Sequence, residues 1–480
     1  MQATRIQSID ALRGIAILGM VLSGSIAFGD CLPAFMYHAQ VPPPLHQFNP
    51  NLPGITWVDL VFPFFIFAMG AAIPLALQKI TSKPKPLQAV LVIAIKRFIM
   101  LAFFALFLNH LKAWVINDNP TAEHHLLSLL AFGLLCIIFS PARNKQHKEA
   151  KYFGRANAFT SKLIKIVALA VALGLLYYLP FWSGKGFNFY KSDIIIVVLA
   201  NMALFGTVIY YLTRNHVGLL IGVLPILMAV FLSAKQPSPS WVKTVYEWDS
   251  IFGLKIDWLY QFYFLKYLFI LLPATVVGDW LVGVSSSKVD TFITSTQKKI
   301  IVAAATGILI VTVCGLYQRM VLATAIYVVL TCIVLYITVR HLPTTNLYRR
   351  LAQLATYLLL LGLCIEPYEG GIKKDSSTYS YYFITSGLAV CALIICTLLA
   401  SNKYARRPLH YLQQIGTNPM VAYVAGSLVL LPLLSLTGLK NYWDSMHQNW
   451  VMGLLKGVTF TAAVALITLL FVRFKWYWKT

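Results

Sequence analysis

The sequence predicts an all-α, polytopic integral membrane protein, and three observations support that prediction. Hydrophobic residues make up 59% of the 480 residues, charged residues only 11%, and the mean hydropathy is +0.72. An ordinary soluble domain carries roughly 25% charged residues. The apolar residues also gather in runs long enough to cross about 30 Å of hydrocarbon as helices. A water-soluble fold could not bury this much apolar surface.

The apolar runs predict about 11–14 transmembrane helices. The candidate spans lie near 11–29, 55–78, 89–110, 125–140, 162–182, 192–212, 215–233, 259–283, 299–317, 320–339, 350–366, 380–400, 416–438 and 452–472. The run 125–140 is short, and the close pairs 192–212/215–233 and 299–317/320–339 are compatible with re-entrant segments. The run 11–29 is also compatible with a cleaved signal peptide, although Asp10 and Arg13 interrupt the expected pattern.

The basic residues predict the orientation of the chain. Most lie in loops that one threading places on the same side as the N-terminus, and cytoplasmic loops are enriched in Lys and Arg. The densest clusters are Lys79, Lys83, Lys85, Lys96 and Arg97, and then Arg143, Lys145, Lys148, Lys151, Arg155, Lys162 and Lys165. The N-terminus is therefore expected in the cytoplasm. The net charge of +23 has this topological explanation, so no nucleic-acid partner is expected.

The whole chain, 1–480, is expected to form one transmembrane domain, with an N-terminal signature at 5–78 and later helices at 89–472. The longest outer loops are 30–54, 234–258 and 367–379, and they are rich in Pro, Gly and aromatic residues. This composition favours ordered caps over a cavity. Six of the seven cysteines fall in apolar runs and Cys31 lies in a loop, so neither a disulfide framework nor a metal site is expected.

Ionisable residues inside spans are candidate functional residues, because each costs about 2.5–3.5 kcal/mol on insertion scales. Near the cytoplasm lie Asp10, Arg13, Arg97, Asp279 and the polar Asn418; toward the outside lie Asp59, Asn109, His110, Asp193, Lys266, Glu366 and Lys456. Simpler roles compete with function. Asp10 and Arg13 are spaced to form a helix-end ion pair, Arg97 and Lys456 could reach the interface, and His110 suits the membrane interface.

The first outer loop holds the strongest catalytic candidates, His46 and His38. Six prolines between residues 30 and 54 stiffen this loop. Histidine accepts protons near neutral pH and can carry an acyl group. Asp59 follows closely enough in sequence to orient an imidazole. Inert, exposed histidines remain an alternative, and no zinc-binding spacing supports a metal site.

Two blocks carry a family resemblance. Residues 8–17, SIDALRGIAI, and residues 54–70, GITWVDLVFPFFIFAMG, resemble the N-terminal signature of heparan-α-glucosaminide N-acetyltransferase and, more closely, its bacterial relatives in the transmembrane acyltransferase group. Weaker similarities follow at 103–109, 271–280 and 416–423. The family histidine lies ten residues before the Asp that matches Asp59; here that position is Asn49, and the nearest histidine is His46. His38 is the second candidate.

The resemblance implies transfer of an acetyl group from cytosolic acetyl-CoA to an amino sugar or glycan on the outer face of a bacterial cytoplasmic (inner) membrane. His46 or His38 would be the base or acyl carrier, and Asp59 would orient it. Arg97, with Asp10, Arg13, Asn109 and Asn418, is the candidate CoA-binding set. The partners implied are membrane lipid, a CoA thioester and a sugar acceptor. A homo-oligomer is left open. A transporter of a sugar or lipid-linked substrate, or a non-catalytic scaffold, are the alternatives.

Overall fold

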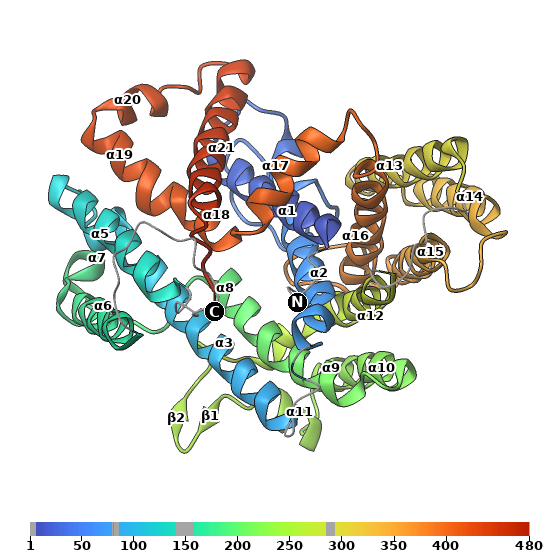
Figure 1. Cartoon of the computed structure of the whole chain (residues 1–480), viewed down its shortest axis with the longest axis horizontal. Coiled ribbons are helices and arrows are strands. Elements are labelled where there is room, and N and C mark those ends of the chain that lie inside the picture. The colour runs from blue at the N-terminus through green and yellow to red at the C-terminus, as the bar shows by residue number, and fades with distance from the viewer. Residues whose placement is uncertain (1–5, 79, 81–85, 141–157, 285–292, 480) are drawn as a thin grey trace.

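The chain folds into a bundle of helices, drawn in Figure 1. The computed structural model describes residues 6–78, 80, 86–140, 158–284 and 293–479. The first third contains α1 (Gln7–Ser25), η1 (Ala34–Met36), α2 (Val58–Leu77), α3 (Pro86–His110), α4 (Ala113–Ile116), α5 (Ala122–Phe139), α6 (Ala158–Tyr178) and α7 (Phe181–Gly184). The middle contains α8 (Ile194–Asn201), η2 (Met202–Gly206), α9 (Thr207–Thr213), α10 (Val217–Ala234), α11 (Trp241–Tyr246), η3 (Phe262–Tyr267), α12 (Leu268–Val284), α13 (Ser295–Tyr317) and α14 (Val321–Val339).

The last third contains α15 (Leu347–Ile365), α16 (Tyr379–Leu399), α17 (Arg406–Gly416), α18 (Pro419–Ala425), η5 (Gly426–Leu430), α19 (Leu431–Leu436), α20 (Leu439–Asp444) and α21 (Trp450–Arg473). The strands of the described part are β1 (Ser250–Ile251) and β2 (Leu254–Lys255), which pair antiparallel. With α11, this hairpin gives the predicted outer loop 234–258 local structure.

The prediction of an all-α membrane protein is confirmed. Thirteen helices in the described part are long and apolar enough to cross a membrane. The pairs that were compatible with re-entrant segments form helices of spanning length instead. Residues 194–213 make one continuous helix through the π-helical turn η2, and α13 and α14 are separate helices. The chain is therefore an integral membrane protein.

One predicted span, 350–366, is not among these thirteen helices. It corresponds to α15, where Arg349 and Arg350 in the first turn lower the hydropathy of the helix. Arg319, after α13, pairs with Glu366, after α15, at 2.5 Å. The two helices therefore end at the same end of the bundle, and α14 runs back between them. It follows that α15, although less apolar, also runs from one end of the bundle to the other.

The bundle has two ends, which the contacts between connecting segments define. At the loop end, residues 26–57 meet residues 366–378, with the Gly54 amide donating to Ile372 O at 2.7 Å. At the N-terminal end, the start of α1 meets α17, with Arg13 donating to Gly416 O at 3.2 Å. Asp10, Arg13 and Asn418, which the sequence placed inside, thus lie at the end opposite to Asp59 and Glu366, which it placed outside. Which end faces the cytoplasm stays a prediction.

The centre of the bundle is formed by α2, α12 and α16 (Figure 1). In α12 and α16, 83% of the most apolar window is buried, against 22% in the peripheral α14 and α21. α2 and α12 cross closely because a glycine of each helix lies against the backbone of the other helix. A Cβ on Gly70 would lie 2.5 Å from Leu271 O, and one on Gly278 would lie 2.4 Å from Ala71 O. Small residues allow such approaches between membrane helices, and this crossing fixes the position of α2.

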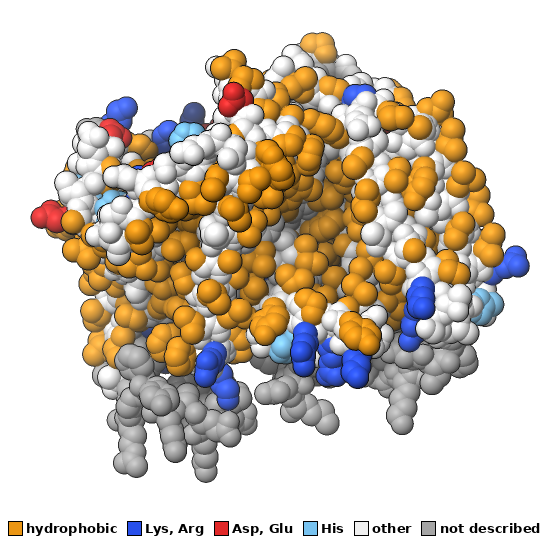
Figure 2. Space-filling model, turned by 90° about the horizontal axis from the view of Figure 1, so that it is seen from above, with side chains coloured by type: hydrophobic (Ala, Val, Ile, Leu, Met, Phe, Trp, Pro, Cys, Tyr) orange, Lys and Arg blue, Asp and Glu red, His pale blue; other side chains and the backbone are white. Residues whose placement is uncertain are grey.

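The surface agrees with a membrane-embedded bundle. Figure 2 shows hydrophobic side chains over a broad band of one face, with Lys and Arg along the lower edge and acidic side chains together with further Lys and Arg toward the upper edge. Lipid hydrocarbon matches such a band. The predicted basic residues Lys79, Lys83, Lys85, Arg143, Lys145, Lys148, Lys151 and Arg155 lie outside the described residues.

Candidate functional site

The site at the loop end is built on the proline-rich segment between α1 and α2. This segment closes on itself through Tyr37, whose hydroxyl donates to Ala27 O at 2.6 Å and whose carbonyl accepts from Thr56 Oγ1 at 2.7 Å. Burial, followed by the nearby Cys31 and Asp30, raises the pKa of Tyr37 to about 12, so the hydroxyl stays protonated as a donor. The segment is therefore pinned to the ends of both flanking helices.

His46 fastens this segment. Its ring stands edge-on to Phe28 and Tyr37, with centroids 5.1 and 4.5 Å away. Its Nε2 lies 2.9 Å from both the amide and the carbonyl of Gly29, and its Nδ1 lies 3.3 Å from Val41 O. Both ring nitrogens thus face backbone groups. The described contacts of His46 do not include Asp59, so the structure does not bring together these two predicted catalytic residues.

His38 is the histidine of this loop that lies beside Asp59. Its Nδ1 accepts a hydrogen bond from the Gln40 amide at 3.0 Å, so the proton of the neutral ring is on Nε2. Nε2 lies 3.4 Å from Asp59 Oδ1 and 3.6 Å from Asp375 Oδ2. The predicted partnership between Asp59 and a first-loop histidine is therefore found with His38.

Asp59 is fully buried in the first turn of α2, where the positive end of the helix dipole favours a carboxylate. Its Oδ2 accepts from the Thr56 amide at 2.9 Å, the Thr56 hydroxyl at 3.3 Å and the Ala39 amide at 3.3 Å. Lys374 Nζ lies 3.9 Å from Oδ1. One oxygen is thus fixed by the backbone, and the other is directed at His38 and Lys374.

Two polar atoms at the centre of this cluster are unsatisfied. His38 Nε2 and Asp59 Oδ1 are both buried, and neither makes a hydrogen bond to any residue that the structure describes. Burial of such groups without partners is costly, and native exceptions often mark functional sites. A hydroxyl or amine that lies beside this pair, within hydrogen-bond distance of both atoms, would accept from Nε2–H and donate to Oδ1. The cluster is therefore suited to bind and polarise such a group.

The loop between α15 and α16 completes the cluster, and the sequence prediction missed it. The Gln40 carboxamide accepts from the Asp375 amide at 2.9 Å and donates to the Asp375 carbonyl. His38 and, to a smaller extent, Lys374 lower the pKa of the Asp375 carboxyl below its ordinary value. Burial alone would raise this pKa. The available signal was the run Lys373-Lys374-Asp375 in a loop that the threading placed on the same side as His38.

The predicted CoA-binding residues are divided between the two ends of the bundle. At the N-terminal end, Asp10 and Arg13 form an ion pair at 3.1 Å, and Arg13 also donates to Gly416 O. Asn418 is fully buried; its Nδ2 donates to Trp476 O at 2.8 Å, and its Oδ1 accepts from the Trp478 amide at 3.2 Å. Arg13 thus links α1 to α17, and Asn418 holds the segment that follows α21.

Arg97 and Asn109 both lie on α3, twelve residues apart. Asn109 is at the loop end, where it donates to Lys191 O and accepts from Lys112 Nζ, both at 3.0 Å. Arg97 is half-buried in the middle of the helix, and within the described ranges no ion pair is formed by its guanidinium. The structure therefore does not bring Asn109 together with Asp10, Arg13 and Asn418 in one site.

His110 is the last residue of α3 and packs inside the protein. Its ring is fully buried among Phe181, Trp182 and Phe187, with centroids 4.8–4.9 Å away. Nδ1 lies 2.7 Å from Leu106 O, and Nε2 accepts from the Asn188 amide at 3.3 Å. Because both nitrogens have partners, the polar ring can be buried without exposure to water.

Metal ligands do not gather in the described part of the chain, where no group of three or more His, Cys, Asp or Glu side chains is arranged to hold an ion. The fold and the site define a polytopic α-helical membrane protein with a buried His–Asp pair under a rigid loop. The chain belongs to the family described as a domain of unknown function, DUF5009, which it matches over residues 5–281, more than half its length. No curated protein matches it.

The family match includes His38, His46, Asp59, Arg97 and the helices from α1 to most of α12. Lys374, Asp375 and Asn418 fall outside it. The candidate site is thus assembled from the matched part of the chain and from a loop in the remainder.

Proposed function

We propose that this protein is a membrane-bound acyltransferase that transfers an acetyl group from acetyl-CoA to an amino sugar or glycan. The observation that carries the proposal is the buried pair of unsatisfied atoms, His38 Nε2 and Asp59 Oδ1, which face each other at 3.4 Å. The resemblance of residues 8–17 and 54–70 to heparan-α-glucosaminide N-acetyltransferase supplies the donor and the class of acceptor. That relationship is part of the proposal.

The tautomer of His38 determines the roles. Because Nδ1 accepts from Gln40, the Nε2–H group is available to donate to the thioester carbonyl oxygen as negative charge develops there. Asp59 Oδ1 then accepts the proton that the acceptor amine or hydroxyl loses. The acceptor, as a neutral amine or a hydroxyl, forms a bond to the acyl carbon and the C–S bond breaks. The CoA thiolate takes the proton from Asp59 and leaves as the thiol, which returns Asp59 to its carboxylate form. This arrangement favours direct transfer over an acylated histidine.

The charges around the pair favour an amine acceptor. Asp59 and Asp375 supply two carboxylates and Lys374 supplies one ammonium, and the roles proposed above require the neutral form of His38. The remaining negative charge attracts a cation such as a protonated amino sugar. His46 serves in this proposal as a positioning residue, because it holds the loop that carries His38.

The donor requires a route from the other end of the bundle. Arg13 and Asn418 are engaged with protein groups, so Arg97 is the member of the predicted set best placed to attract CoA phosphates. The proposal places the loop end outside the cytoplasm and the N-terminus in the cytosol of a bacterial cell. A cysteine introduced at the exposed Phe48, in a background without other exposed cysteines, should react with an impermeant maleimide added outside.

The test uses purified full-length protein with labelled acetyl-CoA and glucosamine-terminated acceptors. Acetylated sugar should form with the wild-type protein, and Asp59→Asn, which keeps the shape of the side chain, should reduce the rate at least about 100-fold. Proteoliposomes separate this proposal from transport. Sugar flux that does not require CoA, without any acetylated product, would contradict the acyltransferase proposal and favour a transporter.

A further inference from the structure

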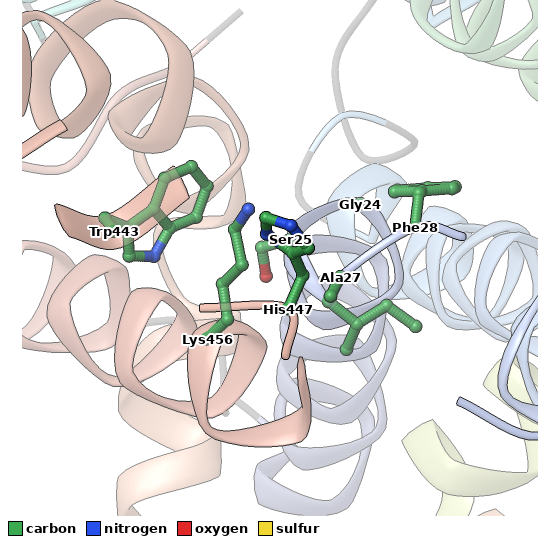
Figure 3. A pocket seen from close by; sticks show the side chains of 8 residues that line it. Gly24, Ser25, Ala27, Phe28, Trp443, His447 and Lys456 are labelled. Atoms are coloured by element: carbon green, nitrogen blue, oxygen red, sulfur yellow. The ribbon is translucent and has the colours of Figure 1, made fainter. Parts of the chain in front are cut away.

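A second polar site lies at the loop end, in a pocket of about 360 Å³ between α1, α20 and α21. We call it the Lys456 pocket; its lining includes Gly24, Ser25, Phe28, Trp443, His447 and Lys456. Figure 3 shows the Lys456 side chain extending between Trp443 on one side and Ser25 and His447 on the other. The His38–Asp59 pair does not line this pocket.

Lys456 does not behave as a lysine that reaches out to water. It stands in the second turn of α21, a membrane-spanning helix, and its side chain is only 14% exposed. Its ammonium lies 4.3 Å above the Trp443 ring, and its nearest carboxylate, on Asp444, is 3.9 Å away. Within the described residues it donates no hydrogen bond. Its partners are thus one long ion pair and one ring face, and a lysine at membrane depth is a candidate functional residue by default.

A second donor in the same place is also unsatisfied. The indole Nε1–H of Trp443 is buried and has no acceptor in the part of the chain that the structure describes. Ser25 and one ring nitrogen of His447 have partners within the protein. The Ser25 hydroxyl donates to Val21 O at 2.7 Å, and His447 Nδ1 lies 2.8 Å from Asp444 O. The pocket therefore offers one ammonium and one indole N–H to an acceptor.

The local charge favours an anion. Asp444 is shared by two lysines, with Lys440 Nζ at 3.8 Å and Lys456 Nζ at 3.9 Å. Two ammonium groups against one carboxylate leave a net positive charge at this rim. An anion with several oxygen acceptors would satisfy both unpaired donors at once.

We infer that the Lys456 pocket binds an anionic phosphate group, presented by a lipid head group at the loop end of the bundle. The depth of Lys456, two turns inside α21, matches the boundary between head groups and hydrocarbon, where lysine side chains meet lipid phosphates. The apolar lining from Phe28 and Ile26 suits the glycerol and upper acyl region. This inference does not depend on acyl transfer.

The test measures the thermal midpoint of the purified full chain in neutral detergent while short-chain lipids are added. Dihexanoyl phosphatidylglycerol should raise the midpoint of the wild type, and zwitterionic dihexanoyl phosphatidylcholine should not. Lys456→Gln should weaken the apparent affinity for the anionic lipid by about tenfold or more, because a charge-assisted hydrogen bond is lost. Lys456→Arg should retain it.

Lys243→Gln is the matched control. Lys243 pairs with Glu247 at 3.9 Å, the same separation as in the Lys456–Asp444 pair, but it is not part of the pocket lining. It should respond to the anionic lipid as the wild type does. Trp443→Phe, which keeps an aromatic ring and removes the N–H, should weaken binding severalfold, and it provides a test even if Lys456→Gln does not fold.

Inorganic phosphate, added alone, separates the two sources of the same chemistry. A shift with lipid but not with phosphate supports a head-group site. A Lys456-dependent shift with phosphate alone supports the anion site but contradicts the lipid assignment. Equal shifts with both lipids, or equal responses of the wild type and Lys456→Gln, would overturn the inference.

Discussion

The carboxamide of Gln40 is hydrogen-bonded to both backbone groups of Asp375, which lies 335 residues later in the chain. This contact joins the proline-rich loop after α1 to the loop between α15 and α16. Asp375 in turn lies 3.6 Å from His38. The candidate site therefore depends on two loops that only the folded bundle brings together, and a buried amide holds them in register.

Removal of this amide should open the site and destabilise the protein. Gln40→Ala leaves the Asp375 N–H and C=O without their partner, at a cost of about 1–3 kcal/mol. The thermal midpoint in detergent should fall, and acetyl transfer should fall further than the loss of folded protein explains. Gln47→Ala, at an exposed position of the same loop, is the control and should change neither. Equal effects of the two substitutions would argue against the clamp.

His46→Ala should act mainly on stability. The ring fills the space between Phe28 and Tyr37 and bonds to Gly29, so its removal should lower the midpoint by several degrees. Alanine at the exposed His216 should leave the midpoint unchanged. If His46→Ala were as stable as the wild type, the fastening role of this residue would be wrong.

The Asp375 carboxyl predicts a dependence on pH. Its pKa is lower in the folded protein than the ordinary value of about 3.9, because His38 and Lys374 favour the charged form. A carboxyl of this kind stabilises the fold when ionised. Its contribution is therefore complete above pH of about 4 and is lost as the pH falls through the native pKa. Because the side chain is half exposed, the effect should be modest.

Midpoints measured between pH 3 and pH 7 test this prediction. The wild type should lose more stability below pH 4 than Asp375→Asn, which cannot be protonated. Parallel curves for the two proteins would show that Asp375 does not contribute in this way.

The crossing of α2 and α12 should tolerate no side chain at Gly278. A methyl group there would lie 2.4 Å from Ala71 O, so Gly278→Ala should destabilise the protein by about 1–3 kcal/mol. Gly133 on α5 is the matched control, because nothing lies within 4 Å of the Cβ that alanine would add. Gly133→Ala should be neutral or slightly stabilising, as alanine favours the helix. Thermal unfolding of both variants in one detergent decides this.

The fold could be predicted from the sequence because the membrane imposes a strong constraint on hydropathy. Even α15, which carries two arginines, was recognised as a helix from its apolar run at 350–366. The pairing of Asp59 with a histidine of the first loop was also within reach, since both lie in one stretch of chain. Which of the two histidines lies beside Asp59 could not be predicted, because it depends on how the proline-rich loop folds.

Lys374 and Asp375 were missed for a different reason. Their proximity to His38 is a tertiary contact between distant loops, and no local pattern encodes it. Asn418 shows the converse case. An intramembrane polar residue was assigned to the ligand, although its amide is satisfied by the backbone at Trp476 and Trp478. Polar residues in spans indicate that a partner exists; they do not indicate whether that partner is protein or ligand.

The rate of acetyl transfer from labelled acetyl-CoA by His38→Ala and His46→Ala, corrected for folded protein, tests the central proposal most directly. The geometry predicts that His38→Ala loses at least about 100-fold of the wild-type rate, while His46→Ala keeps a rate proportional to its folded fraction. Transfer by His38→Ala at the wild-type rate, together with an inactive but folded His46→Ala, would contradict the assignment of His38 as the reacting histidine.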